Sequence, residues 1–139
     1  MNNDLPYNQR ILVSALLKNK QGEALVVRSV CMQDQINDTE YFHLPSWNIS
    51  FGIDPKEKIK NELSTLLEDA VTIEGIISTQ SYLQDGGATH VIEMVFKAST
   101  SKQACKCAET EPKMRFVSPA DADAYIFSSR IKKIIRGEV

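Results

Sequence analysis

Residues 54–70 read Asp54-Pro-Lys-Glu-Lys-Ile-Lys-Asn-Glu-Leu-Ser-Thr-Leu-Leu-Glu-Asp-Ala70, and they carry the clearest structural signal in the chain. Asp54 can cap a helix through its carboxylate, Pro55 suits the first helical position, and Glu57 completes a capping box. Apolar residues then recur at helical spacing, namely Ile59, Leu63, Leu66, Leu67 and Ala70. The stretch therefore predicts an amphipathic helix over about residues 55–70.

Strand patterns lie on both sides of this helix. They cover residues 10–17, 24–30, 41–45, 73–83, 89–98 and 113–117. Asp85-Gly86-Gly87 is a good hairpin turn between the two longest of them, and Ser118-Pro119-Ala120-Asp121 is a second capping signature that opens helical sequence. This order, in which strands surround one helix and a last helix follows, predicts an α+β fold with helices covering a mixed sheet.

The final helical segment is amphipathic. We expect a buried stripe and a solvated basic face, formed respectively by Ile131, Ile134 and Ile135 and by Arg130, Lys132, Lys133 and Arg136.

Length and charge exclude several classes of protein. The chain has 139 residues and a net charge of -2, which suits one domain over residues 1–139 with a structured core at about 8–136. A nucleic-acid binder usually has a strongly basic face, and no apolar run approaches the ~20 residues that cross a membrane. The N-terminus has no secretory signal, so a cytoplasmic location is expected.

Cysteine and histidine usage argues against disulfides and zinc. The three cysteines have no repeated spacing, and both histidines are isolated, whereas a structural zinc site takes four N or S ligands. These residues are Cys31, Cys105, Cys107, His43 and His90.

In this order the segments resemble the Nudix hydrolase superfamily over nearly the whole chain. Phe42-His-Leu-Pro-Ser-Trp47 is similar to the family's aromatic-x-Leu-Pro-Gly-Gly segment, and residues 52–71 stand in the place of its Nudix helix. His90-Val-Ile-Glu-Met-Val-Phe-Lys-Ala98 and Phe116-Val-Ser-Pro-Ala-Asp121 resemble its later strand and last-helix segments. The resemblance implies a Nudix-like α/β/α sandwich and hydrolysis of nucleoside diphosphate-linked substrates with Mg²⁺ or Mn²⁺.

The family's active-site motif is degraded in this chain. That motif is G-x5-E-x7-R-E-U-x-E-E-x-G-U, with U a bulky aliphatic residue, and its glutamates hold the metal against a diphosphate. One register, chosen by apolar spacing, puts Glu57 on the first glutamate and Asp69 on one of the pair, but Thr65 and Leu66 on Arg-Glu. Sliding by one residue puts Glu68 and Asp69 on the glutamate pair and still loses Arg-Glu. The resemblance therefore implies impaired or lost catalysis.

The candidate metal ligands are Glu57, Glu68 and Asp69, joined by one of the loop residues Glu109 and Glu111. Helix capping by Glu57 and a solvated helix face are the alternative explanations. Among aromatic residues, Trp47 and Tyr82 are candidates for stacking on a nucleobase, with core packing as the alternative.

Two functions therefore remain open. The first is an impaired hydrolase, and the second is a non-catalytic domain that binds a nucleotide-like ligand or a protein partner. Members of the family are often dimers, which makes a homodimer a further expectation.

Overall fold

The computed structural model describes residues 8–28, 42–50, 52–101, 114–125 and 129–137. Its strands are β1 (Asn8–Lys18), β2 (Ala24–Arg28), β3 (Phe42–His43), β4 (Ser46–Asn48), β5 (Thr72–Gln84), β6 (Thr89–Ser99) and β7 (Met114–Val117). Its helices are α1 (Pro55–Leu67), α3 (Ala122–Tyr125) and α4 (Ser129–Arg136), and short 3-10 turns are η1 (Asp85–Gly87) and η2 (Pro119–Asp121).

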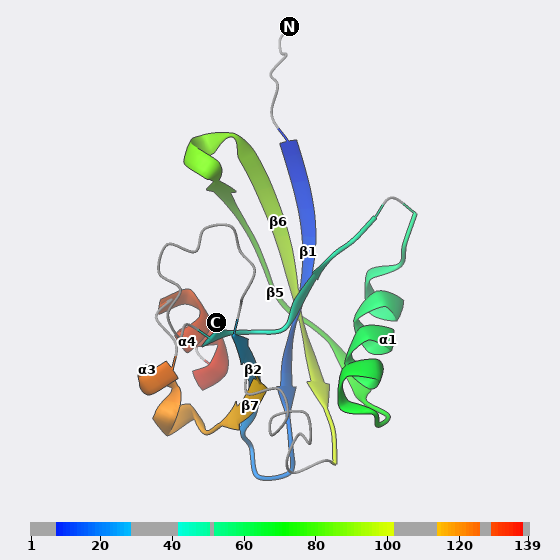
Figure 1. Ribbon diagram of the computed structural model, residues 1–139, viewed down its shortest axis with the longest axis vertical. Coiled ribbons are helices and arrows are strands. Elements are labelled where there is room, and N and C mark those ends of the chain that lie inside the picture. Colours follow the sequence, from blue (N-terminus) through cyan, green and yellow to red (C-terminus); the bar gives the residue numbers. More distant parts are fainter. Residues whose placement is uncertain (1–7, 29–41, 51, 102–113, 126–128, 138–139) are drawn as a thin grey trace, which may run out of the picture.

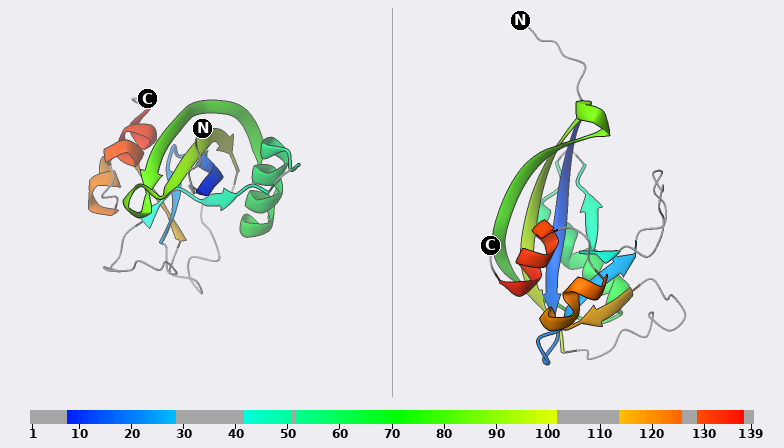
Figure 2. Two further views of the ribbon diagram at one scale, coloured as in Figure 1. Left: turned by 90° about the horizontal axis from the view of Figure 1, so that it is seen from above. Right: turned by 90° about the vertical axis from the view of Figure 1, so that its left-hand side faces the viewer.

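The strands form one mixed sheet. Its order is β3-β2-β1-β6-β5, with β4 pairing with the middle of β1 and β7 with β2. The long strands β1 and β6 run parallel along their whole length, from Asn8 opposite Thr89 to Lys18 opposite Ser99. The other pairs are antiparallel. Figure 1 and the view from above in Figure 2 show α1 on one side of this sheet and α3 with α4 on the other.

The core is divided between the two faces of the sheet. Against one face, α1 buries Ile59, Leu63 and Leu67 on a cluster that includes Val13, Ala15, Leu17 and Phe96. Against the other, α4 buries Ile131, Ile134 and Ile135 on a cluster that includes Leu16, Val26 and Val95. Because side chains alternate along a strand, β1 supplies both faces. Each fully buried Leu or Ile stabilises the fold by about 1.5–3 kcal/mol.

This architecture confirms the predicted α+β class and the buried stripe of the last helix. Capping by Asp54 is confirmed as well, since Asp54 Oδ2 accepts a hydrogen bond from the Glu57 backbone N–H at 3.0 Å, whereas the reciprocal bond from the Glu57 side chain that a capping box needs is not formed among the described residues. The helix is shorter than predicted, since it ends at Leu67 instead of residue 70. Glu68 takes the left-handed conformation there, and its N–H donates to the Ser64 carbonyl oxygen.

The segment at residues 41–45 is also corrected by the structure. Instead of one strand, it contributes the short β3, and the chain then passes Leu44 and Pro45 into β4. The Pro45 carbonyl oxygen accepts a hydrogen bond from the Ala15 N–H at 3.0 Å, so β4 docks on β1 directly after the proline. Cys31, Cys105, Cys107, Glu109 and Glu111 lie outside the described residues. Among the described helices, none is long and apolar enough to cross a membrane.

Candidate functional site

The three candidate metal ligands lie at opposite ends of α1. Glu57 is exposed in the first turn, while Glu68 and Asp69 follow the last turn. At 1.5 Å per residue, Glu57 and Glu68 are separated by roughly 16 Å along the helix axis. A divalent ion bonds its ligands at about 2–2.6 Å, so these carboxylates cannot share one ion. Within the part of the chain that the structure describes, no three His, Cys, Asp or Glu residues are grouped as metal ligands.

Between these ends, the outer side of α1 has few acidic side chains. Glu62 is half-buried and pairs with Lys58 at 3.0 Å, one turn earlier. Thr65 is exposed, and Leu66 packs against the core beneath the helix. Because Mg²⁺ prefers several oxygen ligands, the described face of α1 does not fit such an ion.

The two aromatic candidates lie on opposite faces of the sheet. Trp47 in β4 packs against the α1-side core. Tyr82 in β5 lies on the α4 side, with the Arg130 guanidinium 5.1 Å from the centre of its ring. The structure therefore does not bring the two rings together, and one face of Tyr82 is already covered.

Sequence reasoning missed a buried carboxylate at the centre of the α4 face. Glu93 in β6 has a side chain only 5% exposed, and Arg130 Nη1 donates to its Oε1 at 2.7 Å. Tyr82 Oη donates to the same oxygen at 3.3 Å, and the Ser14 hydroxyl donates to Oε2. Ser46 Oγ lies 2.7 Å from Ser14 Oγ. We call Ser14, Ser46, Tyr82, Glu93 and Arg130 the Glu93 cluster.

Strand register explains how this cluster assembles. In the parallel β1–β6 ladder Leu12 stands opposite Glu93. Because side chains alternate between the two faces along a strand, Ser14, two residues after Leu12, lies on the same face as Glu93. The sequence contains one sign of this buried carboxylate, which is the acidic residue at an inward-facing position of the otherwise apolar run Val91-Ile-Glu-Met-Val95. A buried carboxylate needs partners, and Arg130 on α4 provides the countercharge.

The charge of Glu93 affects the pKa of two side chains, Tyr82 within the cluster and His43 outside it. Burial raises the pKa of Tyr82, and the negative charge of Glu93 raises it further. Burial lowers the pKa of His43, although its Nδ1 contact with the Leu44 carbonyl oxygen at 2.8 Å and the charge of Glu93 act in the opposite direction. Both side chains therefore favour their neutral forms.

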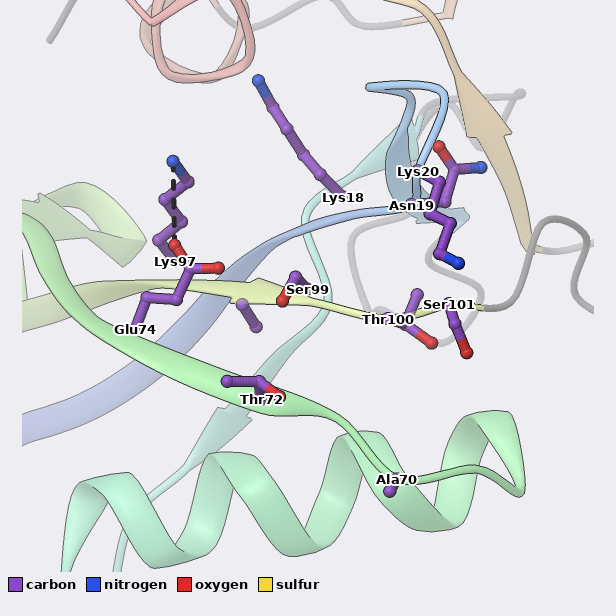
Figure 3. Close-up of a pocket in the computed structure, with 11 residues that line it drawn as sticks. Lys18, Asn19, Lys20, Ala70, Thr72, Glu74, Lys97, Ser99, Thr100 and Ser101 are labelled. Carbon is purple, nitrogen blue, oxygen red and sulfur yellow. Dashed lines mark ion pairs between the residues drawn. The ribbon is translucent and has the colours of Figure 1, made fainter.

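A separate hollow lies where β1 and β6 end side by side and β5 begins (Figure 3). Its volume is about 490 Å³, and its lining carries three lysines, Lys18, Lys20 and Lys97, against one carboxylate, Glu74. The lining also includes four residues with hydroxyl groups, which are Thr72, Ser99, Thr100 and Ser101.

Comparison with known proteins assigns the fold. No protein-family model and no curated protein sequence matches this chain. Among solved structures, a Nudix hydrolase from Nitrosomonas europaea superposes with a TM-score of 0.68 at 11% identity, covering 93% of this chain and 87% of that one. The dihydroneopterin triphosphate pyrophosphohydrolase of E. coli gives a TM-score of 0.69 at 10% identity, covering 96% and 97%.

The mixed sheet between two helical layers thus defines an α/β/α sandwich of a known class. That class is the Nudix hydrolase fold, and the resemblance seen in the sequence is confirmed at the level of fold.

One further neighbour is longer than this chain. A protein from Sinorhizobium meliloti 1021, named as an oxidoreductase, is 25% identical with a TM-score of 0.62. The match covers 93% of this chain and 38% of that protein, so this chain spans less than half of its length.

Proposed function

We propose that this chain is a Nudix-fold protein related to hydrolases of nucleoside diphosphate-linked substrates, in which hydrolysis is impaired or lost. The fold neighbours support the first half of this proposal, since they include a pyrophosphohydrolase and a Nudix hydrolase. The second half rests on a single observation, which is the conformation of Glu68 after α1.

The position of Glu68 sets the register of the motif. A glycine directly after a helix commonly takes the left-handed conformation, and the family motif has a glycine near its end. In this chain the left-handed residue is Glu68, with φ 56° and ψ 42°, so we align it with that glycine. The same count aligns Trp47 with the motif's first glycine, which agrees with the similarity of Leu44-Pro-Ser-Trp47 to Leu-Pro-Gly-Gly. This register differs from the one chosen by apolar spacing and from the one obtained by sliding it by one residue.

In this register only one of the motif's four glutamate positions keeps an acidic residue. Asn61 replaces the arginine, Glu62 keeps the glutamate after it, and Ile53, Thr65 and Leu66 replace the other three glutamates. A lone carboxylate gives a hard cation too few oxygen ligands, so neither the metal nor the water that it would activate is held in place. We therefore propose Glu62, instead of Glu57, Glu68 or Asp69, as the position on which any remaining turnover depends.

A non-catalytic domain that binds a nucleotide-like ligand is the second candidate. The observation that favours it is the contrast between a complete fold and neutral side chains at three of the motif's acidic positions. A binding domain needs the scaffold and its ligand contacts, but it does not need the metal.

A turnover assay tests the first proposal. Purified protein is incubated with nucleoside triphosphates, nucleotide sugars and dinucleoside polyphosphates in Mg²⁺ or Mn²⁺, and phosphate release is measured after coupled digestion. We expect turnover near the blank, a rise when Thr65→Glu and Leu66→Glu are combined, and no rise in the matched control Lys56→Glu with Lys60→Glu. Wild-type turnover of about 1 s⁻¹ or more, typical of ordinary enzymes, would contradict the proposal.

Calorimetric binding of the same compounds separates the two candidates. Binding without turnover supports the second candidate. Residual turnover that Glu62→Gln abolishes and Glu68→Gln leaves intact supports the first. Absence of both binding and turnover would contradict both candidate functions.

A further inference from the structure

We propose that the hollow at the end of β1 and β6 binds a phosphate group, as free phosphate or as the monoester of a small molecule. The hollow is distinct from the α1 face that carries Glu62, and this inference does not depend on the proposed function. Its evidence is the charge and the geometry of its lining.

The strand register brings like charges together. In the parallel β1–β6 ladder Lys18 stands opposite Ser99, and Leu16 stands opposite Lys97. Lys18 and Lys97 are therefore diagonal neighbours on one face, and Figure 3 shows both extending to the side of the strands away from α1. Two positively charged side chains thus share one face of neighbouring strands, where a bound anion would offset their repulsion.

Carboxylates of the protein neutralise the charges of these lysines only weakly. Lys97 Nζ lies 3.8 Å from Glu74 Oε1, and these side chains are 46% and 40% exposed, so the pair is loose and well solvated. Neither Lys18 nor Lys20 forms an ion pair with any residue that the structure describes. The hollow is thus positive in a chain whose net charge is -2.

The frame of the hollow is held by hydrogen bonds. Asn19 Oδ1 accepts from the backbone N–H groups of Gln21 and Glu23, at 3.1 and 2.9 Å, which fixes the turn that carries Lys20. The Thr100 N–H donates to the Lys18 carbonyl oxygen at 3.0 Å, which ties the end of β6 to the end of β1.

The chemistry of the lining selects phosphate. Ammonium groups are charged donors, and the hydroxyls of Thr72 and Ser99 add neutral donors for the several oxygens of a phosphate. A divalent cation is disfavoured because one carboxylate faces three lysines. The volume of about 490 Å³ exceeds the needs of a phosphate ion and leaves space for the group that it esterifies.

Calorimetric or ³¹P NMR titration tests this proposal on the full chain, in EDTA and at low ionic strength. The probes are inorganic phosphate, ribose 5-phosphate and, as the uncharged control, ribose. EDTA removes any metal-dependent binding, so the result is independent of the hydrolase proposal. We expect saturable binding of phosphate that weakens with added salt, and none of ribose. Tighter binding of ribose 5-phosphate identifies an ester as the ligand, and equal binding identifies free phosphate.

Substitutions of opposite sign make the test specific. Lys18→Gln should weaken phosphate binding about fivefold, because an attraction of about 1 kcal/mol at 4 Å in water is lost. Glu74→Gln should strengthen binding, since it removes the one repelling carboxylate, and Lys60→Gln on the exposed face of α1 should leave it unchanged. Absence of saturable binding by the wild type, or equal weakening by Lys60→Gln, would overturn the proposal.

Discussion

Glu68 is the residue on which the interpretation of α1 depends most. The left-handed conformation costs a non-glycine residue about 1–2 kcal/mol, yet the helix ends there, and Val71 three residues later is buried in the core. A glutamate, unlike a glycine, does not predict a left-handed conformation. The sequence therefore predicted the start of α1 from Asp54 and Pro55 but placed its end three residues late.

Replacing Glu68 by glycine should stabilise the protein. Glycine adopts the left-handed conformation without steric cost, and part of this gain is lost to its greater freedom in the unfolded chain, so we expect a net gain of about 0.5–1 kcal/mol. The midpoint of urea unfolding measures it. Glu68→Ala is the control, and an equal gain from alanine would show that conformation is not the cause.

His43 should make stability depend on pH. Burial holds its pKa below the ordinary value of 6.5, so the unfolded chain binds a proton more readily than the folded protein. Its contribution to stability is complete above about pH 6.5 and is lost as the pH falls through the lowered folded pKa.

The measurement is the thermal midpoint between about pH 7.5 and pH 5, for the wild type and for His43→Asn. Asparagine retains an N–H donor near the Leu44 carbonyl oxygen but does not titrate in this range. We expect a smaller fall in the variant, and identical pH profiles would contradict the assignment.

At the scale of elements, α4 is held by charge as well as by apolar packing. Its three isoleucines were predictable from their spacing. Arg130 was expected on a solvated basic face, and this expectation is wrong: its side chain is 31% exposed and pairs with the buried Glu93. The periodicity of a helix predicts which residues face the sheet, but it does not show that a strand presents a carboxylate there.

Removing the charge of Arg130 should cost more than removing that of a neighbouring lysine. Arg130→Met leaves Glu93 buried without its countercharge, and we expect a loss of about 2–4 kcal/mol in the free energy of unfolding. Lys132→Met breaks a 3.5 Å pair with Asp123, whose side chain is 63% exposed, and should cost at most about 1 kcal/mol. Chemical denaturation measures both.

A double variant checks the cause of that loss. Glu93→Gln combined with Arg130→Met removes both charges and should recover part of the stability lost by Arg130→Met alone. Additive losses would show that the pair is not coupled.

The candidate site was less predictable than the elements, for a physical reason. Glu57, Glu68 and Asp69 lie within 13 positions of one another in the sequence. In the structure, however, Glu57 lies at one end of the 13-residue helix α1 and the other two lie beyond its other end, which is too far apart for one metal ion to bind them all. The Glu93 cluster has the opposite character, since Ser14 and Glu93 are far apart in sequence and meet only through the β1–β6 pairing. Such contacts follow from strand register, which a single sequence does not specify.

For the whole molecule, divalent metal should have little effect on stability. A ligand held only by the native state stabilises it by about 2.7 kcal/mol at a hundredfold excess over its dissociation constant. Because the carboxylates on α1 do not converge, we expect the thermal midpoint to be unchanged by millimolar Mg²⁺ or Mn²⁺. A rise that Glu62→Gln removes would instead reveal a functioning metal site.

The pairing of β1 with β6 has a consequence for how the protein is made. The two strands lie roughly 80 residues apart in the chain, and closing so long a loop is slow and entropically costly. During synthesis β1 emerges first and can pair with β2 and β4, but its edge that pairs with β6 stays open until β6 has left the ribosome. The β5–β6 hairpin, whose contacts are local, can form before β1 docks. Until β6 docks, this open edge of β1 is a place where the nascent chain can pair wrongly or aggregate.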